Sequence, residues 1–240
     1  MKIALLGYGK MGQAIEEIAI KKGHSIACKV SIENLEEGTI ENIQKADIVI
    51  EFTGPHSAFD NLKLCIDAGV PVVSGSTGWL EKYDEIKKYC EEKKGGLLYA
   101  SNFSVGVNIF FALNKKLAQL IDGHEEYNVE LKEIHHTQKL DAPSGTAITL
   151  AEGVLEKIGY KNKWVNQPSS KKEELVIISE RKDPAPGTHI INYYSEVDDI
   201  TIIHTAHSRK GFASGAVLAA EFLNAHKQGI FSMKDVLGIN

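Results

Sequence analysis

Short apolar runs alternate with longer amphipathic stretches along roughly the first hundred residues of the chain. The runs have the length and β-branched content of strands, and apolar positions in the stretches between them recur with the period of a helix. Strict alternation of strand and helix is typical of a parallel sheet with helices on its faces. The predicted strands are Lys2–Leu6, Ser25–Val30, Ile48–Phe52, Val70–Ser74 and Leu97–Ala100, and the predicted helices are Met11–Lys22, His56–Ala68 and Leu80–Lys93.

The pattern changes near residue 104, where strands and helices no longer alternate one by one. A helix is predicted at Asn108–Ile121, a strand at Asn128–His136 and a second helix after Ser144. This order is typical of an α+β unit built on a mixed or antiparallel sheet, so the chain is expected to form two domains. The remaining predictions are a polar stretch at Lys161–Glu174, β-rich runs at Leu175–Ser179, Thr188–Ser195 and Ile200–Ala206, and an apolar helix at Ala213–His226.

The composition of the chain narrows the possible classes of function. Its 240 residues carry 27 Lys and Arg against 32 Asp and Glu, a net charge of −5 that argues against nucleic acid as a partner. No apolar run reaches the roughly 18 to 20 residues of a membrane span, and no signal-peptide core precedes Gly7, so no membrane partner and a cytoplasmic location are expected. Cys28, Cys65 and Cys90 form no C-x-x-C pair, so neither a disulfide framework nor a metal site is predicted.

A glycine-rich turn follows the first predicted strand. It has the pattern G-x-G-x-x-G, placed between a strand and a helix. The first glycine would allow the tight turn, the second would let the backbone approach a pyrophosphate, and the third would let helix and strand pack closely. The pattern predicts a dinucleotide site in a Rossmann-like domain, and a turn that serves packing alone is the alternative. The residues concerned are Gly7, Tyr8, Gly9, Lys10, Met11 and Gly12.

The end of the second predicted strand bears on the choice between NADH and NADPH. NAD-selective Rossmann domains place a carboxylate there to bind the ribose hydroxyls. Here the strand ends with Lys29 and Ser31, and the first carboxylate is Glu33, so the residues favour NADPH, although Lys29 can equally be a plain surface lysine. Two further strand ends are predicted to contact the nicotinamide, with simple turns as the alternative. They comprise Gly75, Ser76 and Thr77, and Ala100, Ser101, Asn102 and Phe103.

The segment over residues 133–147 is the most informative part of the chain. It contains two adjacent histidines, a lysine, and a Pro-Ser-Gly-Thr run that leads into a predicted helix. The serine suits the N-cap, and the glycine and threonine place N–H groups and a hydroxyl at the helix start, where an anion binds readily. An imidazole, a cation and a helix N-terminus on one loop suit an anionic substrate and a proton transfer, and a capped helix with solvated charges is the alternative. The candidate residues are His135, His136, Lys139, Ser144, Gly145 and Thr146.

Together these motifs resemble the 4-hydroxy-tetrahydrodipicolinate reductase family, also called the dihydrodipicolinate reductase family. The resemblance rests on the run from Glu133 to Ala147, on Asn-Phe-Ser-Val-Gly-Val-Asn at 102–108 and on the glycine turn at 7–12, and it covers essentially the whole chain. It implies NAD(P)H-dependent reduction of 4-hydroxy-tetrahydrodipicolinate to tetrahydrodipicolinate with loss of water, in diaminopimelate and lysine biosynthesis. It also implies a homotetramer that binds a small-molecule dicarboxylate.

The resemblance implies roles for individual residues as well. The implied fold is a Rossmann-like α/β nucleotide domain over residues 1–104, rejoined by a C-terminal helix at about 213–240, and an α+β substrate-binding and oligomerisation domain over residues 105–212. A cation and a proton source suit the reaction, because hydride addition leaves negative charge on the conjugated ring. His135 would be the acid/base, Lys139 the proton donor, and His136, Lys139, Ser144, Gly145 and Thr146 would hold the dicarboxylate.

Some positions depart from the family pattern. Ser76 stands where threonine is usual, and Ser31 stands where an acidic ribose ligand is frequent. Asp183 replaces the first glycine of the family's R-x-G-x-x-x-G-x-H run, which here extends from Arg181 to His189. Aspartate cannot adopt the full conformational range of glycine cheaply, so the shape of this loop stays open.

Two other functions are weighed against this one. The first is another Rossmann reductase of amino-acid metabolism, but an acylating dehydrogenase needs a cysteine nucleophile near the nicotinamide, and neither Cys65 nor Cys90 is placed for it. The second is a non-enzymatic NAD(P)-sensing module, against which the joint presence of the histidines, the lysine and the Ser-Gly-Thr run argues.

Overall fold

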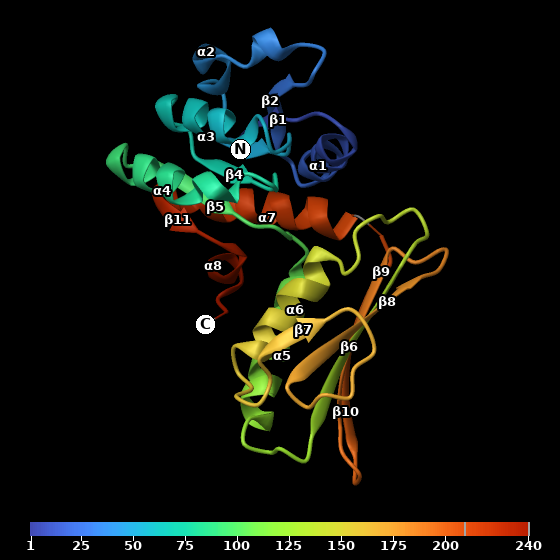
Figure 1. The fold of residues 1–240 in the computed structure, drawn as a ribbon. Coiled ribbons are helices and arrows are strands. Elements are labelled where there is room, and N and C mark those ends of the chain that lie inside the picture. Colours follow the sequence, from blue (N-terminus) through green and yellow to red (C-terminus); the bar gives the residue numbers. More distant parts are fainter. Residues whose placement is uncertain (209, 240) are drawn as a thin grey trace. The chain divides into compact units, whose positions relative to one another are not determined.

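The computed structural model of the chain describes residues 1–208 and 210–239; Arg209 and Asn240, which fall within the predicted domain ranges, lie outside the described residues. The chain forms two compact units (Figure 1). The first comprises Met1–Val105 together with the chain from Lys210 onward, and the second comprises the chain between Gly106 and helix α7 (Lys210–His226). Each unit has a sheet of its own.

The first unit contains a six-stranded parallel sheet. Helices connect its strands, so the unit has the Rossmann-like α/β class that the alternating pattern predicted. Across the sheet the strands follow the order β11 (Gly229–Phe231), β5 (Gly96–Tyr99), β4 (Val72–Ser74), β3 (Ile48–Glu51), β1 (Lys2–Leu6) and β2 (Ser25–Val30).

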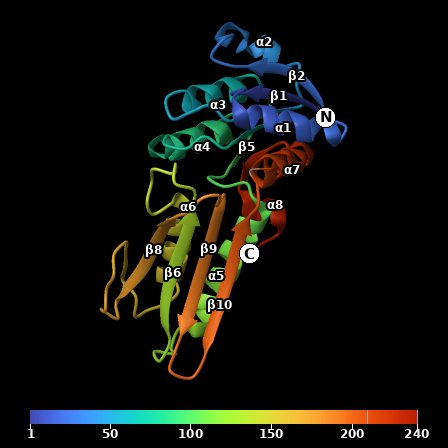
Figure 2. The same ribbon diagram turned by 90° about the vertical axis from the view of Figure 1, so that its right-hand side faces the viewer.

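Alternating side chains of these strands build two apolar cores, one on each face of the sheet. In β1, Ile3 and Leu5 belong to one core and Ala4 and Leu6 to the other, as expected for a strand buried on both faces. The sheet therefore has a helical layer on each side (Figure 2). The first face is covered by α1 (Lys10–Lys21) and α7, and the second by α3 (Ala58–Asp67) and α4 (Tyr83–Glu92).

The C-terminal segment contains the apolar helix predicted over Ala213–His226, followed by elements that the pattern did not predict. Helix α7 ends at His226 as predicted, because Lys227 adopts a left-handed φ of 58° that closes the helix. The chain then adds β11 to the edge of the sheet and forms a short helix, α8 (Met233–Leu237). Elements this short carry too few residues for a hydrophobic period to predict them. The other short elements are α2 (Ile40–Ile43) and the 3₁₀ turns η1 (Leu35–Glu37) and η2 (Leu80–Lys82).

The second unit contains a five-stranded mixed sheet, as the α+β pattern predicted. Its central strand, β6 (Asn128–His135), pairs antiparallel with β9 (Gly187–Tyr194) and parallel with β8 (Glu174–Arg181). At the edges, β10 (Asp199–Ala206) pairs antiparallel with β9, and β7 (Lys163–Val165) pairs parallel with β8. Strand β7 lies within the polar stretch at Lys161–Glu174, where no strand was predicted, because three residues are too few to show a pattern.

Two helices, α5 (Val105–Ile121) and α6 (Gly145–Leu155), pack on one face of this sheet over a third apolar core. Figure 2 shows both helices on the same side of the strands. The opposite face carries exposed apolar side chains at Ile178, Tyr194 and Ile203.

The side chains of β6 alternate between these two faces. Val129 and Leu131 point into the helix-covered core, and Glu133 and His135 continue the same buried row toward the carboxyl end of the strand. The fold therefore buries two polar side chains where the apolar row ends.

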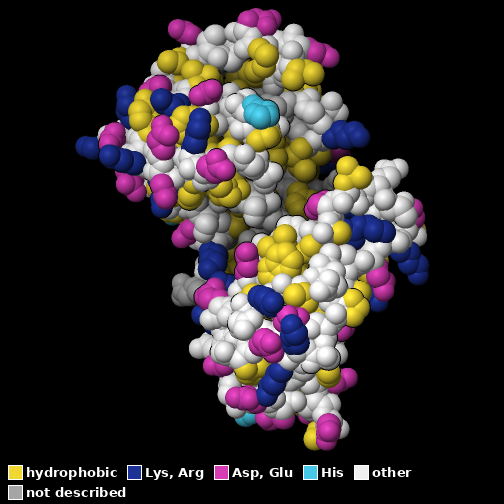
Figure 3. Space-filling view, in the orientation of Figure 1, with side chains coloured by type: hydrophobic (Ala, Val, Ile, Leu, Met, Phe, Trp, Pro, Cys, Tyr) yellow, Lys and Arg dark blue, Asp and Glu magenta, His cyan; other side chains and the backbone are white. Residues whose placement is uncertain are grey.

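The surface shown in Figure 3 carries Lys and Arg side chains interspersed with Asp and Glu, in keeping with the small net charge. None of the helices within residues 1–208 and 210–239 is both long and apolar enough to span a membrane.

Candidate active site

A row of polar side chains crosses the helix-covered face of the second sheet. Strand pairing sets Glu133 on β6 opposite Ser179 on β8 and opposite His189 on β9. It also sets His189 opposite His204 on β10. His135 lies two residues after Glu133, so its side chain points to the same face. Side chains from four strands therefore converge at one place, although they are far apart in the sequence.

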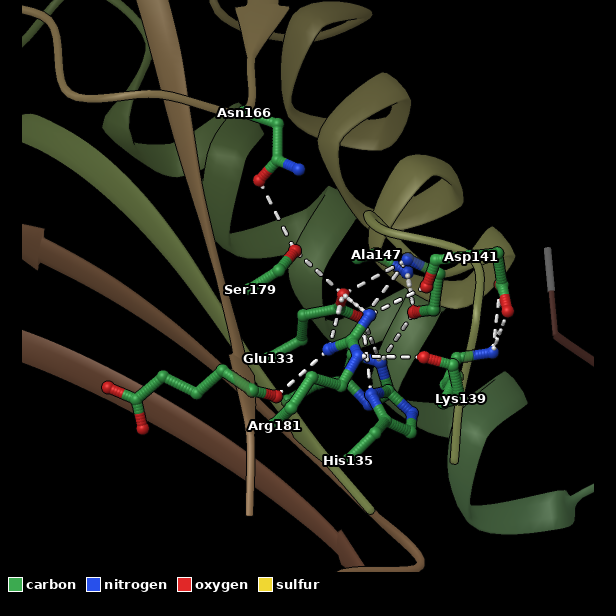
Figure 4. Close-up of polar contacts among 11 residues, drawn as sticks. Glu133, His135, Lys139, Asp141, Ala147, Asn166, Ser179 and Arg181 are labelled. Atoms are coloured by element: carbon green, nitrogen blue, oxygen red, sulfur yellow. Dashed lines mark hydrogen bonds and ion pairs between the residues drawn. The ribbon is translucent and has the colours of Figure 1, made fainter. Parts of the chain in front are cut away.

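Glu133 is fully buried, and its carboxylate contacts residues from several elements of the site (Figure 4). Ser144 donates its backbone N–H to both carboxylate oxygens, at 3.1 and 3.2 Å, and Ser179 donates its hydroxyl to Oε1 at 2.8 Å. Arg181 Nη2 lies 3.4 Å from Oε1, and His135 Nδ1 lies 3.3 Å from Oε2. Burial alone would raise the pKa of the Glu133 carboxyl, but its contacts with His135, Ser144 and Ser179 outweigh burial and hold that pKa well below its usual value.

His189 is buried beside the same carboxylate and is neutral at physiological pH. Burial and the neighbouring His135 lower its pKa from 6.5 to about 4, against the opposing effect of Glu133. Ser144 Oγ, which accepts the N–H of Ala147, also lies 3.2 Å from His189 Nε2. His189 Nδ1 is buried and has no hydrogen bond among the described residues.

Ser144 also begins helix α6. Its hydroxyl accepts the N–H of Ala147 at 3.2 Å, and the first turn carries no acidic residue. Gly145 is exposed and Thr146 is half-buried at the start of the helix. The N-terminus of α6 therefore presents partial positive charge that suits a carboxylate, one residue beyond the Ser144 N–H that binds Glu133.

Lys139 lies on the loop between β6 and α6. Its ammonium binds both carboxylate oxygens of Asp141, at 2.7 and 2.8 Å. Arg181 supports this loop, because its guanidinium donates to the backbone oxygens of Lys139 and Asp141 at 3.3 and 2.6 Å. The same guanidinium reaches Glu133, so Arg181 connects the lysine loop to the buried carboxylate (Figure 4).

The loop between β8 and β9 also supports the loop between β6 and α6, in addition to the contacts made by Arg181. Asp183, which stands in place of the glycine expected from the resemblance, accepts the N–H and the hydroxyl of Thr137 at 3.2 and 2.6 Å. His136 donates its backbone N–H to the carbonyl of Ala185 at 2.8 Å. The aspartate therefore anchors the loop that follows His135. These contacts also define the shape of the Arg181–His189 loop, which the sequence alone left open.

In the first unit, a cavity of about 690 Å³ opens at the carboxyl ends of β1 and β3. Gly7 has a φ of 95°, and a Cβ there would lie 2.0 Å from the carbonyl oxygen of Phe52, so only glycine fits. A Cβ on Gly9 would meet no atom within 4 Å, and one on Gly12 would meet the Gly7 oxygen at 2.3 Å. A tight turn, an open approach and a close helix contact are what pyrophosphate binding requires. Gly7, Tyr8 and Gly9 line the cavity, and Lys10, Met11 and Gly12 form the first turn of α1.

The two residues predicted to bind near the ribose lie in different surroundings. Ser31 lines the cavity together with Glu33. Lys29 is not among the lining residues: its Nζ lies 3.2 Å from Glu16 Oε1 on α1 and 4.6 Å from the centre of the Tyr8 ring. The lysine charge is therefore already paired.

The other two predicted contact loops meet at the carboxyl ends of β4 and β5. A buried carboxylate, Glu51, accepts the hydroxyl of Ser76 at 2.6 Å and so fixes the turn after β4. The Phe52 ring lies 2.2 Å from the position that a Cβ of Gly75 would take, and its centre lies 5.5 Å from that of Phe103. In these loops Thr77 and Ser101 are exposed, Asn102 is half-buried and Ala100 is buried.

One group of described side chains places possible metal-binding atoms within 4.8 Å of one another: Glu133, His135 and His189. The Glu133 carboxylate already contacts the Arg181 guanidinium and accepts the N–H of Ser144, so a divalent cation would have to approach a guanidinium. We therefore assign no metal to this group.

Sequence reasoning selected the histidine, the lysine and the serine of this site but missed the side chains that connect them. Glu133 shares a strand face with His135 two residues away, so the alternation of β6 could have indicated it. Arg181 and His189 approach it only because of the pairing of β6 with β8 and β9, and no local pattern reports that register.

Comparison with known proteins gives matches over nearly the whole chain. Family models described as "Dihydrodipicolinate reductase, N-terminus" and "Dihydrodipicolinate reductase, C-terminus" match residues 1–103 and 106–237. A 4-hydroxy-tetrahydrodipicolinate reductase of Christiangramia forsetii is 48% identical over 99% of this chain and 98% of its own length. One of Methanococcus vannielii is 34% identical over 92% of this chain and 86% of its own. The dipicolinate-bound dihydrodipicolinate reductase of Paenisporosarcina sp. TG-14 has a TM-score of 0.75, with 25% identity over 97% of both chains.

Replacing His189 by glutamine is expected to make the free energy of unfolding less dependent on pH between pH 4 and 7. Between its unfolded pKa of 6.5 and its folded pKa of about 4, the unfolded chain binds a proton that the folded protein does not. The stability contribution is therefore fully present above pH 6.5 and is lost as the pH falls toward 4, by about 3 kcal/mol in total. Urea unfolding between pH 4 and 7 measures this loss of stability. His124→Gln, at an exposed histidine of the same unit, is the control and should keep the wild-type dependence of the unfolding free energy on pH. If the wild-type protein showed as little dependence on pH as His189→Gln, the result would contradict the lowered pKa of His189.

Proposed function

The chain belongs to the dihydrodipicolinate reductase family, and we propose that its catalytic centre is the group of side chains joined by Glu133 in the second unit. One observation supports this most directly. The imidazole of His135, the loop that carries Lys139 and the N-terminus of α6 are all held by contacts to a single buried carboxylate or to the arginine beside it.

The chain is an oxidoreductase that reduces 4-hydroxy-tetrahydrodipicolinate to tetrahydrodipicolinate with NAD(P)H, in diaminopimelate and lysine biosynthesis. The reaction adds a hydride and a proton to the ring system and releases the hydroxyl group as water. Negative charge develops on the conjugated ring when the hydride arrives, so a proton source and a cation beside the ring lower the barrier.

In the proposed mechanism, His135 is the acid/base and Lys139 is the proton donor. The loop that carries Lys139 follows directly after His135 on β6, which suits both to one small substrate. The Lys139 ammonium is bound to Asp141, so a substrate carboxylate would compete with that side chain for the same cation. The residues proposed to hold the dicarboxylate are His136, Lys139, Ser144, Gly145 and Thr146.

We assign dinucleotide binding to the first unit, over residues 1–104 and from about 213 onward, and substrate binding to residues 105–212. The open space at Gly9 and the cavity beside it support this assignment. When bound, the reduced nicotinamide supplies the hydride. The proposed cofactor-binding residues are Gly7, Tyr8, Gly9, Lys10, Met11, Gly12, Lys29, Ser31, Gly75, Ser76, Thr77, Ala100, Ser101, Asn102 and Phe103.

Between the two cofactors we propose a modest preference for NADPH. Ser31 lines the cavity where NAD-selective domains place a carboxylate, and Lys29 supplies a cation close to it in sequence. Glu16 limits the preference, because it pairs with the Lys29 ammonium. Glu33 adds a carboxylate to the same cavity.

The proposed assembly is a homotetramer formed through the second unit. Ile178, Tyr194 and Ile203 are exposed on the face of the sheet that α5 and α6 do not cover, and an apolar sheet face of this kind suits burial against another copy. The proposed compartment is the cytoplasm, a reducing environment that suits the free thiols of Cys28, Cys65 and Cys90.

The thiols also bear on the rival reductases. Cys65 lies within α3 and Cys90 within α4, and both are buried. Burial raises the pKa of the Cys65 thiol well above its usual value and that of Cys90 to about 11. Neither thiol is an activated nucleophile, so an acylating dehydrogenase is disfavoured.

Replacing His135 by glutamine should lower kcat by about 10²- to 10⁴-fold with little change in KM, because the proton transfer loses its acid/base group. Replacing Lys139 by alanine should lower kcat and raise KM, since it removes both a proton source and a carboxylate ligand. Oxidation of reduced nicotinamide, with substrate generated by a condensing synthase, measures both. Gln138→Ala, an exposed position on the same loop, is the control. Wild-type kinetics in both active-site variants would refute the roles assigned to His135 and Lys139. If the protein were instead a sensing module, the wild type would bind cofactor without turnover.

Replacing Glu16 by glutamine should raise the ratio of kcat/KM for NADPH over NADH several-fold, because Lys29 is released toward the 2′-phosphate. Ser31→Asp should lower the ratio by about tenfold, equivalent to about 1.4 kcal/mol, since it places a carboxylate against that phosphate. Glu17→Gln, the neighbouring surface carboxylate of α1, is the matched control. An unchanged ratio in both test variants would place the selectivity elsewhere.

Light scattering should give a mass of about four times 26.4 kDa for the wild-type protein. Ile203→Glu should reduce this mass, because it places a charge in the proposed apolar interface. Leu120→Glu makes the same kind of change at an exposed apolar position on α5, where 61% of the side chain is accessible against 60% at Ile203, and should leave the tetramer intact. A tetramer that survives Ile203→Glu would locate the interface elsewhere.

A further inference from the structure

The proposed mechanism leaves the most deeply buried charge of the site, the Glu133 carboxylate, without a role. This side chain has no exposed surface and is charged at neutral pH. Burying a charge is costly, and a carboxylate that served only to connect strands could be replaced by neutral hydrogen-bonding groups. Its contacts therefore call for a functional reason, and the inference below rests on the proposed role of His135.

The two oxygens of Glu133 have different neighbours. Oε1 receives the hydroxyl of Ser179 and faces the Arg181 guanidinium, at 2.8 and 3.4 Å. Oε2 lies 3.3 Å from His135 Nδ1 and 3.8 Å from the nearest nitrogen of His189. The contact to His135 is close but is not aligned as a well-formed hydrogen bond, so charge more than hydrogen-bond geometry carries it. The backbone N–H of Ser144 reaches both oxygens, at 3.1 and 3.2 Å. Oε1 therefore also has the hydroxyl and the guanidinium of β8 beside it, whereas Oε2 has the two imidazoles beside it.

Among the described residues, the nearby cations do not pair with Oε2, which therefore keeps its negative charge toward the imidazoles. The guanidinium is engaged at Oε1, and the nearby ammonium is bound to a carboxylate of its own loop. The two further imidazoles are neutral at physiological pH, because burial lowers their pKa values. Oε2 is therefore the anionic atom that faces His135 Nδ1. The groups that face the pair are Arg181 from β8, His189 from β9, His204 from β10, and Lys139 with Asp141 from the loop before α6.

The other nitrogen of the His135 ring is left accessible by a glycine. A Cβ on Gly187 would lie 3.0 Å from His135 Nε2, whereas the glycine leaves that space free. With Nδ1 turned toward Glu133, Nε2 is the nitrogen that can exchange a proton with a substrate.

We propose that Glu133 is a positioning residue that holds the His135 imidazole for proton transfer and couples it to the anion site at the start of α6. Glu133 Oε2 faces His135 Nδ1, and the same carboxylate binds the N–H of Ser144, the N-cap of α6. The proton passes between His135 Nε2 and the substrate, while Glu133 stays ionised throughout. Orientation of the acid and placement of the substrate anion thus depend on one side chain.

The test compares Glu133→Gln, which keeps the shape and removes the charge, with Glu133→Asp, which keeps the charge. Glu133→Gln should lower kcat about 10- to 100-fold, as where carboxylates orient the histidine ligands of metal sites, with a smaller change in KM. The alkaline limb of the pH profile of kcat/KM should move to lower pH, because the carboxylate charge that faces His135 Nδ1 is removed. Glu133→Asp should keep the limb at its wild-type position although kcat falls.

Glu152→Gln, the same change on the exposed surface of α6, is the matched control, and its pH profile should stay at the wild-type position. Melting temperature and cofactor fluorescence report whether each variant is folded. A merely structural role would lower stability and leave the alkaline limb in place, and that result in a folded Glu133→Gln protein would overturn the proposal.

A measurement on the unmodified protein covers the case in which Glu133→Gln does not fold. The side-chain carboxyl ¹³C resonance of Glu133 should shift at the pH at which the ring protons of His135 titrate. A carboxyl resonance that stays flat through that titration would also overturn the proposal. If His135→Gln retains turnover, the proposed function itself fails; if it loses turnover while Glu133→Gln keeps the wild-type profile, only the positioning role fails.

Discussion

The need to replace the water around one buried carboxylate organises the second unit. A charge moved out of water costs several kcal/mol unless donors and counter-charges compensate it. Glu133 obtains this compensation from Ser179 and Arg181 on β8 and from the backbone of Ser144 before α6. Each of these contacts fixes an element next to β6, so the interactions that stabilise the charge are the same ones that place His135 and the start of α6 side by side.

A comparison with Glu51 in the first unit shows why the surroundings of a buried carboxylate matter. Glu51 is equally buried at the end of β3, but its partners are the hydroxyls of Ser74 and Ser76 and the backbone N–H of Thr53. Neutral donors of this kind fix the geometry of a turn. Glu133 instead contacts a guanidinium and an imidazole, groups that can carry a charge of their own. One carboxylate therefore supports the shape of a loop, and the other lies where it can support the proposed acid–base chemistry.

Much of the fold could be predicted from the sequence because it follows from local periods. Strands β1 and β2 have the predicted bounds, since their apolar runs end at a glycine or a polar residue. Strand β11 was not predicted, however, because it adds only three residues to the sheet edge. For the site, His135, Lys139 and Ser144 were selectable by chemical type within one short run. Arg181 and His189 were not, because their nearness depends on the registers of β8 and β9 against β6.

Asp183 illustrates how a change in one loop is absorbed by another. Losing a glycine restricts the backbone of the β8–β9 loop. The aspartate side chain, however, gains two hydrogen bonds from Thr137, one from the N–H and one from the hydroxyl. Thr137 lies two residues after His135, so these bonds act on the loop that begins where the imidazole is held. The conformational freedom lost in one loop is thus offset by a tether on the other, and both loops stay fixed around the buried carboxylate.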